Sequence, residues 1–434
     1  MVTGTTLSRA FPLASRLDER GRLEVGGCDA IELAREFGTP AYVVAEDDLR
    51  TRARAFLAAA REAGREDLHV VFASKAFPCS AVLALFAREG LWCDVASAGE
   101  LHLALNAGFA PERIVLHGNA KSEAELRMAL ARGVGLIVLD NFDEIERLER
   151  LIGEGALSDG ASQDVLVRVT PDVRGETHEK ISTGQADSKF GFAMDLAGEA
   201  IARTEATAGL ALRGLHAHIG SQLSSLEPFR RAAGELARLG SFPVLDLGGG
   251  LGVSYTEDQP APPTIEEYVG AIVAAVEEAG LDPQTRLLIE PGRSLCANAA
   301  VTLYTVESVK QNVSRWVAVD GGMSDNLRPM LYGAVYEAHV ADRFAGETSC
   351  VLAGKHCESG DVIVREARLD DPRPGDVIVT PATGAYGYAM ANNYNGVPRA
   401  PVIFCREGEA RVVLRRESLE DLTVRDVASP GDDG

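Results

Sequence analysis

Lys75 is the residue whose type and position point most directly to chemistry. It ends the apolar run HVVFASK (69–75), where a charged side chain is costly to bury unless it is paired or neutralised. A lysine of lowered pKa can condense with an aldehyde to form a Schiff base. A lone lysine at the end of a strand more often simply reaches solvent, so the chemical interpretation needs partners elsewhere in the chain.

Two later segments offer such partners. Gly248, Gly249 and Gly250 follow the run PVLDL, and three successive glycines let backbone N–H groups approach a phosphate closely. Glu290 opens the motif EPGR, and a carboxylate there can bond the protonated nitrogen of a pyridine ring. Each segment also has a plainer interpretation: the glycines form only a turn, and Glu290 pairs with Arg293.

His216 and His218 lie two residues apart in the run LRGLHAHIG (212–220), so their side chains face the same way on a strand. With Ser221 and Gln222 just beyond, the two histidines raise the question of a metal. We expect none, because no acidic or cysteine residue lies at ligand spacing nearby. Stacking of one imidazole on an aromatic cofactor fits better, and His216, the deeper of the two, is also compatible with a buried core histidine.

The C-terminal third of the chain brings further reactive groups together. It places Arg328 four residues before Tyr332, Cys357 beside Glu358, and Tyr386 in a glycine-flanked turn. Each of these segments alone is compatible with ordinary loop structure. A cysteine such as Cys357 is usually an inert small residue.

The elements that must position these residues recur between about residues 40 and 300. Short β-branched, apolar runs end in polar or glycine-rich clusters, and amphipathic helical stretches follow them. The runs are HVVFASK (69–75), LWCDVAS (91–97), RIVLHGN (113–119), GLIVLD (135–140), DVLVRVT (164–170), LRGLHAHIG (212–220), PVLDLGGG (243–250) and RLLIEPG (286–292). Eight strands alternating with helices predict a (β/α)8 barrel of the TIM type.

The places of the unusual residues support the barrel. They fall at or just past the C-terminal ends of the predicted strands: Lys75, Asp94, Asn119, Asp140, Arg168, His218, Gly248 to Gly250 and Glu290. In barrel enzymes that rim carries the active site. A doubly wound sheet is the alternative that the pattern leaves open.

After residue 300 the pattern changes to short alternating runs without long helices between them, which predicts an all-β, barrel-like second domain. The runs are DVIVRE (361–366), DVIVT (376–380), PVIFC (401–405) and ARVVLRR (410–416). The early strand GRLEVGG is a candidate to join them. We therefore expect a barrel over 38–300 and a β-rich domain formed by 1–37 and 301–434, which completes the active site.

Composition restricts the class of partner. The net charge of −21, from 43 basic and 64 acidic residues, argues against nucleic acid or an anionic membrane surface. The seven cysteines contain no Cys-x-x-Cys pair, so neither a disulfide framework nor a structural zinc site is expected. No signal-peptide core and no membrane-spanning run is present, which favours a cytoplasmic protein.

In their order and spacing, the segments resemble the diaminopimelate decarboxylase family, which belongs to the alanine-racemase-like (fold-type III) pyridoxal-phosphate enzymes. The resemblance runs from GTPAYVV (38–44) to about Arg416. It rests on ASKAF, CDVASAGEL, LHGNAKS, THEKISTG with SKFGF, HAHIGSQ, DLGGGLG, EPGR, DGGMSDNLRPMLYGA, GKHCESGD and ATGAYGYA. One departure is Phe72, where the family usually has tyrosine.

The resemblance implies a role for each candidate in binding pyridoxal 5'-phosphate. Lys75 would hold the cofactor covalently, His218 would stack on its ring, and Glu290 would pair with its nitrogen. Asp94 would also belong to the cofactor site. The phosphate would be surrounded by Ser221, Gly248, Gly249, Gly250, Gly292, Arg293 and Tyr386.

The resemblance also implies how the substrate is held. Its distal carboxylate would meet Arg293, Arg328 and Tyr332, with Tyr386 nearby, and Glu358 would recognise its distal amino group. Cys357 would supply a proton after carbon dioxide leaves. In such enzymes Cys357 and Glu358 come from the second subunit of a homodimer, so each site is shared.

The implied reaction is decarboxylation of meso-2,6-diaminopimelate to L-lysine and CO2. The alternatives are an ornithine- or lysine-type decarboxylase, a racemase of the same fold, and a non-enzymatic relative. Glu290 and the Cys357–Glu358 pair disfavour the racemase, and the presence of both the lysine and the thiol disfavours the non-enzymatic relative. The loop at 177–189 is a candidate to close over the site.

Overall fold

The computed structural model describes residues 6–173 and 188–427, and in it the chain divides into two compact units. The barrel unit consists of Leu49–Val253 and Pro260–Leu295. The β-rich unit consists of the residues up to Asp48, Ser254–Gln259 and the residues from Cys296 onward. The loop expected to close over the site, 177–189, lies outside the described residues except for its last two positions.

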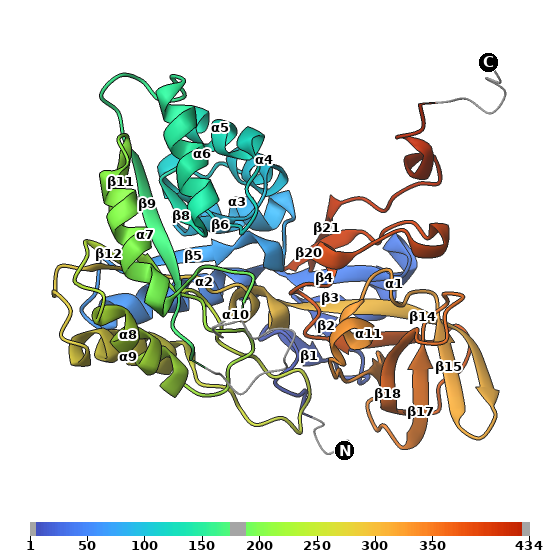
Figure 1. Cartoon of the computed structure of the whole chain (residues 1–434). Helices are drawn as coiled ribbons and strands as arrows, with labels where there is room; N and C mark the ends of the chain where they lie inside the picture. Colours follow the sequence, from blue (N-terminus) through green and yellow to red (C-terminus); the bar gives the residue numbers. More distant parts are fainter. Residues whose placement is uncertain (1–5, 174–187, 428–434) are drawn as a thin grey trace. The chain divides into compact units, whose positions relative to one another are not determined.

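Eight parallel strands form a closed ring in the barrel unit. Most of them are labelled in Figure 1. In order around the ring they are β5 (His69–Ala73), β6 (Trp92–Val95), β7 (Ile114–Leu116), β8 (Leu136–Leu139), β9 (Gln163–Thr170), β11 (Leu210–His216), β12 (Val244–Asp246) and β13 (Arg286–Ile289). Strand β13 pairs with β5, and β8 pairs with β9, so the ring has no open edge. This confirms the (β/α)8 barrel and excludes a doubly wound sheet.

Helices separate the strands along the chain. They are α2 (Glu46–Glu62), α3 (Ser80–Arg88), α4 (Ala98–Asn106), α5 (Glu123–Arg132), α6 (Phe142–Gly153), α7 (Met194–Ala206), α8 (Glu227–Ala237), α9 (Ile265–Glu278) and α10 (Arg293–Cys296), with the short strand β10 (Phe192–Ala193) before α7. Local sequence fixes several starts: a capping box of Ser122 and Glu125 begins α5, and one of Thr264 and Glu267 begins α9.

Apolar side chains from the strands fill part of the barrel interior. This cluster consists of Val71, Val115, Leu136, Val138, Leu166, Val244 and Leu288, with Trp92 packed against it. The members come from six of the eight strands, so the barrel is a packed core and has no pore. Polar side chains buried at the C-terminal strand ends are therefore exceptions that need a reason.

The β-rich unit confirms the predicted second domain. Its strands are β1 (Ser15–Leu17), β2 (Leu23–Val25), β3 (Cys28–Asp29), β4 (Ala41–Ala45), β14 (Ala300–Gln311), β15 (Arg315–Val319), β16 (His339–Val340), β17 (Thr348–Ala353), β18 (Val362–Leu369), β19 (Val377–Pro381), β20 (Val402–Arg406) and β21 (Glu409–Leu414). Two helices accompany them, α1 (Ala30–Phe37) and α11 (Arg328–Tyr332).

The units depart from the expected boundaries at 38–48, 254–259 and 296–300, and the first of these departures has a clear cause. Strand β4, expected within the barrel region 38–300, pairs antiparallel with β14 and parallel with β20. It is buried along its whole length in the β-rich unit. The hydrophobic run GTPAYVV thus forms a central strand of the second sheet, whose path is β18-β17-β15-β14-β4-β20-β21.

Among the described residues, no helix is both long enough and apolar enough to cross a membrane.

Candidate active site

Lys75 lies in a short 3-10 turn, η1 (Ser74–Ala76), directly after β5. Its Nζ is 3.2 Å from Oδ2 of Asp94, the second-last residue of the neighbouring strand β6. The side chain of Lys75 is 48% exposed, whereas that of Asp94 is 2% exposed. The lysine therefore reaches the rim, as expected for a solvent-facing lysine, but a buried carboxylate fixes its direction.

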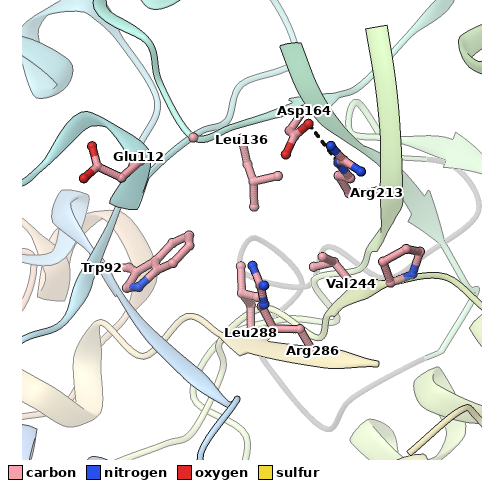
Figure 2. A pocket seen from close by; sticks show the side chains of 10 residues that line it. Trp92, Glu112, Leu136, Asp164, Arg213, Val244, Arg286 and Leu288 are labelled. Carbon is pink, nitrogen blue, oxygen red and sulfur yellow. Dashed lines mark ion pairs between the residues drawn. The ribbon is translucent and has the colours of Figure 1, made fainter. Parts of the chain in front are cut away.

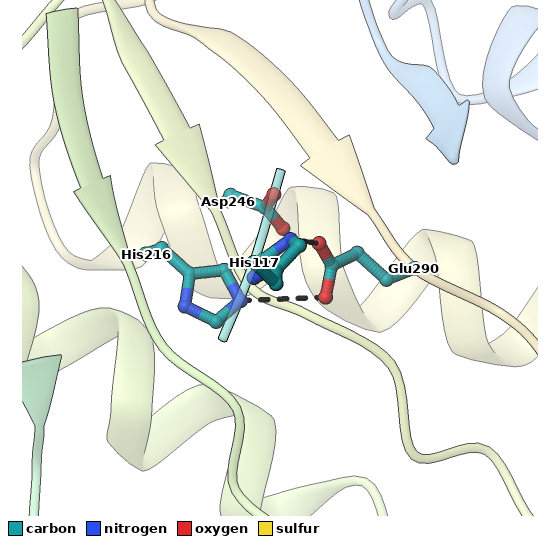
Figure 3. A group of neighbouring side chains, drawn as sticks. All are labelled: His117, His216, Asp246 and Glu290. Carbon is teal, nitrogen blue, oxygen red and sulfur yellow. Dashed lines mark hydrogen bonds and ion pairs between the residues drawn. The ribbon is translucent and has the colours of Figure 1, made fainter. Parts of the chain in front are cut away.

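Glu290 is buried just past the end of β13, the strand next to β5 in the ring. Its Oε1 is 2.6 Å from Nε2 of His117, and its Oε2 is 3.3 Å from Nε2 of His216 (Figure 3). The two imidazole rings meet edge to face, with their centroids 4.8 Å apart. Glu290 thus has two histidine partners, a role that the motif EPGR had suggested only for Arg293.

A second buried carboxylate belongs to the same group. Asp246 ends β12, between the strands of His216 and Glu290, and its side chain lies beside theirs (Figure 3). One ligand atom from each of His117, His216, Asp246 and Glu290 lies within 4.8 Å of the others. The sequence argument against a metal was therefore wrong in its premise, because Asp246 and Glu290 come to His216 from neighbouring strands.

Burial and mutual contact set the charges of this group. Burial raises the pKa of Glu290, but His117 and His216 outweigh this effect and hold the pKa well below its usual range. Burial and the adjacent Glu290 raise the pKa of Asp246 well above its usual range. Burial lowers the pKa of His216 to about 3, against the attraction of Glu290. Glu290 is thus ionised beside a neutral acid and a neutral imidazole.

The glycine triplet is required by close packing as well as by conformation. Gly248 and Gly250 have φ of +65° and +130°, and a side chain on Gly249 would meet the carbonyl oxygen of Glu290 at 2.1 Å. The N–H of Gly248 donates to Asp246 Oδ1 (2.9 Å), and the N–H of Gly249 donates to His218 Nδ1 (3.2 Å). Both N–H groups already bond acceptors within the protein. Fewer backbone N–H groups of the triplet therefore remain to bind a phosphate than the sequence led us to expect.

Two other predicted cofactor residues meet near the triplet. Arg293, at the start of α10, is buried and donates from Nη2 to Ser221 Oγ (3.0 Å). Gly292 packs against the end of β5, since a side chain there would meet Ala73 and Ala76 at 3.0 and 3.1 Å. Ser221 and Arg293, both predicted to surround the phosphate, are thus in contact, and Arg293 places a buried guanidinium beside the Ser221 hydroxyl.

Buried polar atoms that lack a hydrogen-bond partner show whether these residues fit pyridoxal phosphate. Oε1 of Glu290 and Nε2 of His117 are close, yet neither has a partner in hydrogen-bonding geometry. A buried carboxylate oxygen without an aligned donor is what a protonated ring nitrogen requires. With Lys75 on the neighbouring strand, the barrel residues fit the cofactor.

The remaining strand-end residues hold loops. Arg168 stands over the ring of Phe190 (4.4 Å) and 3.8 Å from Asp140, and burial lowers the pKa of its guanidinium. Lys121 and Glu144 form a fully buried ion pair of 2.6 Å. This pair ties the loop after β7 to the start of α6, so it supports the rim without facing it.

Other predicted residues lie in the β-rich unit. Arg328, at the start of α11, is buried with its guanidinium over the rings of Tyr255 (4.6 Å) and Tyr336 (5.5 Å), and it donates to the Tyr336 hydroxyl. Burial opposes the charge of Arg328, but Tyr255 and Tyr336 raise its pKa above the usual value. Tyr332, expected as its partner, lies half-buried at the end of the same helix.

Cys357 and Glu358 are exposed on the loop between β17 and β18. The backbone N–H of Cys357 donates to Asn395 (2.8 Å), and the buried Asp361 accepts from both the N–H and the ring of His356. The thiol is thus presented by a firmly held loop. Tyr386 is half-buried and has φ of +64°, which marks a strained turn.

A pocket of about 370 Å³ opens at the opposite, N-terminal end of the barrel strands (Figure 2). Trp92, Arg213 and Arg286 line it, together with Asp164, which pairs with Arg213 at 2.8 Å. None of the predicted site residues lines this pocket. Sequence reasoning missed His117 and Asp246 at the other end, although both stand at the ends of predicted strand runs.

Comparison with known proteins agrees with this geometry. Residues 47–297 match the family model described as pyridoxal-dependent decarboxylase, pyridoxal binding domain. The chain is 48% identical to a diaminopimelate decarboxylase of Actinosynnema pretiosum subsp. auranticum, over 96% of this chain and 95% of that protein. It is 46% identical to the one from Bacillus subtilis, over 95% and 97%.

A solved structure gives the same result. Diaminopimelate decarboxylase from M. jannaschii, in co-complex with L-lysine, is similar with a TM-score of 0.89 and 32% identity, over 96% of this chain and 99% of that one. The barrel, the lysine at its rim and the identity over nearly the full length lead to one assignment. The chain belongs to the diaminopimelate decarboxylase family of pyridoxal-dependent decarboxylases.

Proposed function

We propose that this protein removes one carboxylate from meso-2,6-diaminopimelate to give L-lysine and CO2, with pyridoxal phosphate bound through Lys75. The observation that carries the proposal is Glu290, a buried, ionised carboxylate on the strand next to Lys75. It occurs in a chain that is 48% identical to a diaminopimelate decarboxylase.

The barrel residues bind and orient the cofactor in this proposal. Lys75 anchors it, and Asp94 directs the lysine until substrate replaces it. Glu290 keeps a proton on the ring nitrogen, and His218 stacks on the ring. Arg293 and Ser221, with Gly292, the glycine triplet and Tyr386, receive the phosphate. When bound, the cofactor accepts the electron pair left at the α-carbon by the departing CO2.

Substrate choice is assigned to Arg328. Among residues 6–173 and 188–427 no carboxylate pairs with this buried guanidinium, whose neighbours are tyrosines. A buried cation without an anionic partner is costly, so it favours a ligand that brings a carboxylate. Diaminopimelate has a distal carboxylate, whereas ornithine and lysine have none, and for those substrates Arg328 would stay unpaired. Tyr332 and Arg293 would assist it.

Cys357 is assigned as the donor that protonates the α-carbon, and Glu358 as the acceptor for the distal amino group. An exposed thiol on a held loop suits a donor that must approach from outside its own barrel. We propose that both residues serve the site of a second copy of the chain, in a cytoplasmic homodimer.

The substrate assignment is tested with the purified protein reconstituted with pyridoxal phosphate. Release of CO2 and formation of lysine are measured with meso-diaminopimelate, ornithine, lysine and arginine. The proposal predicts turnover of meso-diaminopimelate and little of the other three. Faster turnover of ornithine would show that Arg328 does not select a distal carboxylate. Arg328→Met should reduce the difference in turnover between meso-diaminopimelate and the other substrates. Arg213→Met, at the N-terminal end of the barrel strands, should leave this difference unchanged.

The shared site has its own test. Lys75→Ala and Cys357→Ala are each expected to be inactive, but mixing the two should restore part of the activity through hybrid dimers. No recovery, after exchange of subunits has been verified by mass, would contradict the shared site.

A further inference from the structure

The group around Glu290 contains more ionisable side chains than the proposed reaction uses. Glu290 and Asp246 are 5% and 0% exposed, and they stand on adjacent strands. Two carboxylates this close and this deeply buried are not expected both to be ionised, and their protons titrate as a shared set. One of them must therefore carry a proton, and the surroundings decide which one.

The hydrogen bonds favour a neutral Asp246. Its Oδ1 accepts one N–H from Gly248, while both oxygens of Glu290 are approached by imidazoles. A carboxylate that faces two ring nitrogens is the better place for the negative charge. Asp246 then holds the spare proton beside it.

The two histidines are not equivalent. His216 Nε2 is 3.3 Å from Glu290, and this ring is neutral because burial holds its pKa at about 3. His117 Nε2 is closer, at 2.6 Å, on the side of the carboxylate oxygen that has no aligned hydrogen bond. Of the two imidazoles, His117 therefore makes the closer contact with the charge of Glu290.

We propose that His117 is a positioning residue, which keeps Glu290 ionised and oriented while Asp246 stays neutral. This inference rests on the proposed function, because the ionised Glu290 matters only if it faces a ring nitrogen. His117 acts through Glu290 and touches no reacting atom. Its loss should let Glu290 take up a proton and weaken its hold on the ring nitrogen.

The first test reads the apoprotein and needs no activity. The infrared difference spectrum between the wild-type apoprotein and Asp246→Asn should contain the carbonyl band of one protonated carboxyl, which the variant lacks. In His117→Phe a second such band should appear and vanish again in His117→Phe/Glu290→Gln. If Asp246→Asn loses no protonated-carboxyl band, or if His117→Phe gains none, the inference is overturned.

The second test reads the holoenzyme. With ¹⁵N-labelled cofactor, His117→Phe should shift the ring-nitrogen resonance toward the unprotonated value and lower kcat roughly 10- to 100-fold, with KM changed little. His117→Phe combined with Glu290→Gln should be no slower than Glu290→Gln alone, since both act on one carboxylate. Multiplying losses would contradict action through Glu290.

Two controls keep these outcomes separable. His102→Phe, on the exposed face of α4, should change neither spectrum nor rate. If His117→Phe does not fold, as judged by circular dichroism, His117→Asn serves instead and should produce the same shifts at smaller size. If diaminopimelate is not the substrate but the infrared and nitrogen shifts occur, the proposed function fails and the role of His117 stands.

Discussion

At the C-terminal end of the barrel strands, a group of ionisable side chains around Glu290 is buried and its members face one another, whereas at the N-terminal end the ion pair of Arg213 and Asp164 is partly exposed to water. Glu290 and His216 have side chains that are 4% and 1% exposed (Figure 3). Arg213 and Asp164 form an ion pair at the other end with side chains 45% and 38% exposed (Figure 2).

The difference between the two ends shows where the loss of hydration of ionisable groups is accepted in this fold. Exposed ion pairs contribute little stability and cost little to form. Buried ionisable groups each lose several kcal/mol of hydration, which only good partners or a ligand can offset. The same strands supply both ends, so the group of buried ionisable side chains that face one another marks the C-terminal end as the candidate place of chemistry.

The largest expected effect separates the two ends most sharply. Lys75→Ala should abolish the visible absorbance of bound cofactor and lower kcat/KM at least roughly 1,000-fold, because it removes the covalent anchor. Absorbance spectra and steady-state rates measure this. A variant that keeps its visible band would show that Lys75 is a solvent-facing lysine after all.

Replacement of the central carboxylate should have the next largest effect. Glu290→Gln keeps the shape but loses the charge, so kcat should fall roughly 100-fold, or about 2.7 kcal/mol. Single-turnover rates at saturating cofactor distinguish this from weaker cofactor binding. An unchanged rate would remove the reason for burying Glu290.

Stability against pH offers a third contrast. The folded pKa of His216 is about 3, below an unfolded value near 6.5, so its contribution is fully present above pH 6.5 and is lost as pH falls toward 3. His216 alone should lower the free energy of unfolding by about 2 kcal/mol as the pH falls from 6.5 to 5. The shift of the urea midpoint with pH should be flatter in His216→Phe. Equal slopes in both proteins would contradict a neutral buried His216.

A histidine at the opposite end provides the matched comparison. His69, stacked on Trp92 at 4.5 Å, has its pKa lowered to about 4 by burial and by Arg286 and Arg113. His69 should also lower the stability as the pH falls, since its pKa in the folded protein lies below its pKa in the unfolded chain. Water screens it, so His69→Asn should flatten the acid slope less than His216→Phe. The reverse order would contradict the contrast between the two ends.

The smallest effect is expected from the exposed pair. Arg213→Ala should change the free energy of unfolding by less than about 1 kcal/mol and leave kcat within roughly twofold. Thermal melting and the decarboxylation assay measure both quantities. A large loss of activity would mean that the N-terminal end takes part in function.

The sequence predicts the elements well because the signals are local. Each of the eight runs forms a barrel strand, and the alternating segments after residue 300 form the second sheet. Lys75, Asp94 and Glu290 stand at strand ends as expected. Strand β4, the first strand of the 38–300 region, lies in the other sheet. The sequence does not reveal this, because its partners β14 and β20 lie far along the chain.

What the sequence could not provide is contact between distant residues. His117 and Asp246 come to Glu290 through strand register, and nothing in their spacing along the chain reveals it. The rings that surround Arg328 come from Tyr255 and Tyr336, and not from Tyr332 one turn away. Burial, which sets the charges at the site, also appears only in three dimensions.

The central claim is that the C-terminal end of the barrel holds pyridoxal phosphate through Lys75. It is tested most directly by reducing the holoenzyme with borohydride, digesting it and sequencing the modified peptide by mass spectrometry. We predict one phosphopyridoxyl group per chain, on Lys75, and none in the Lys75→Ala variant. A modification at another lysine, or none in the wild-type chain, would contradict the account.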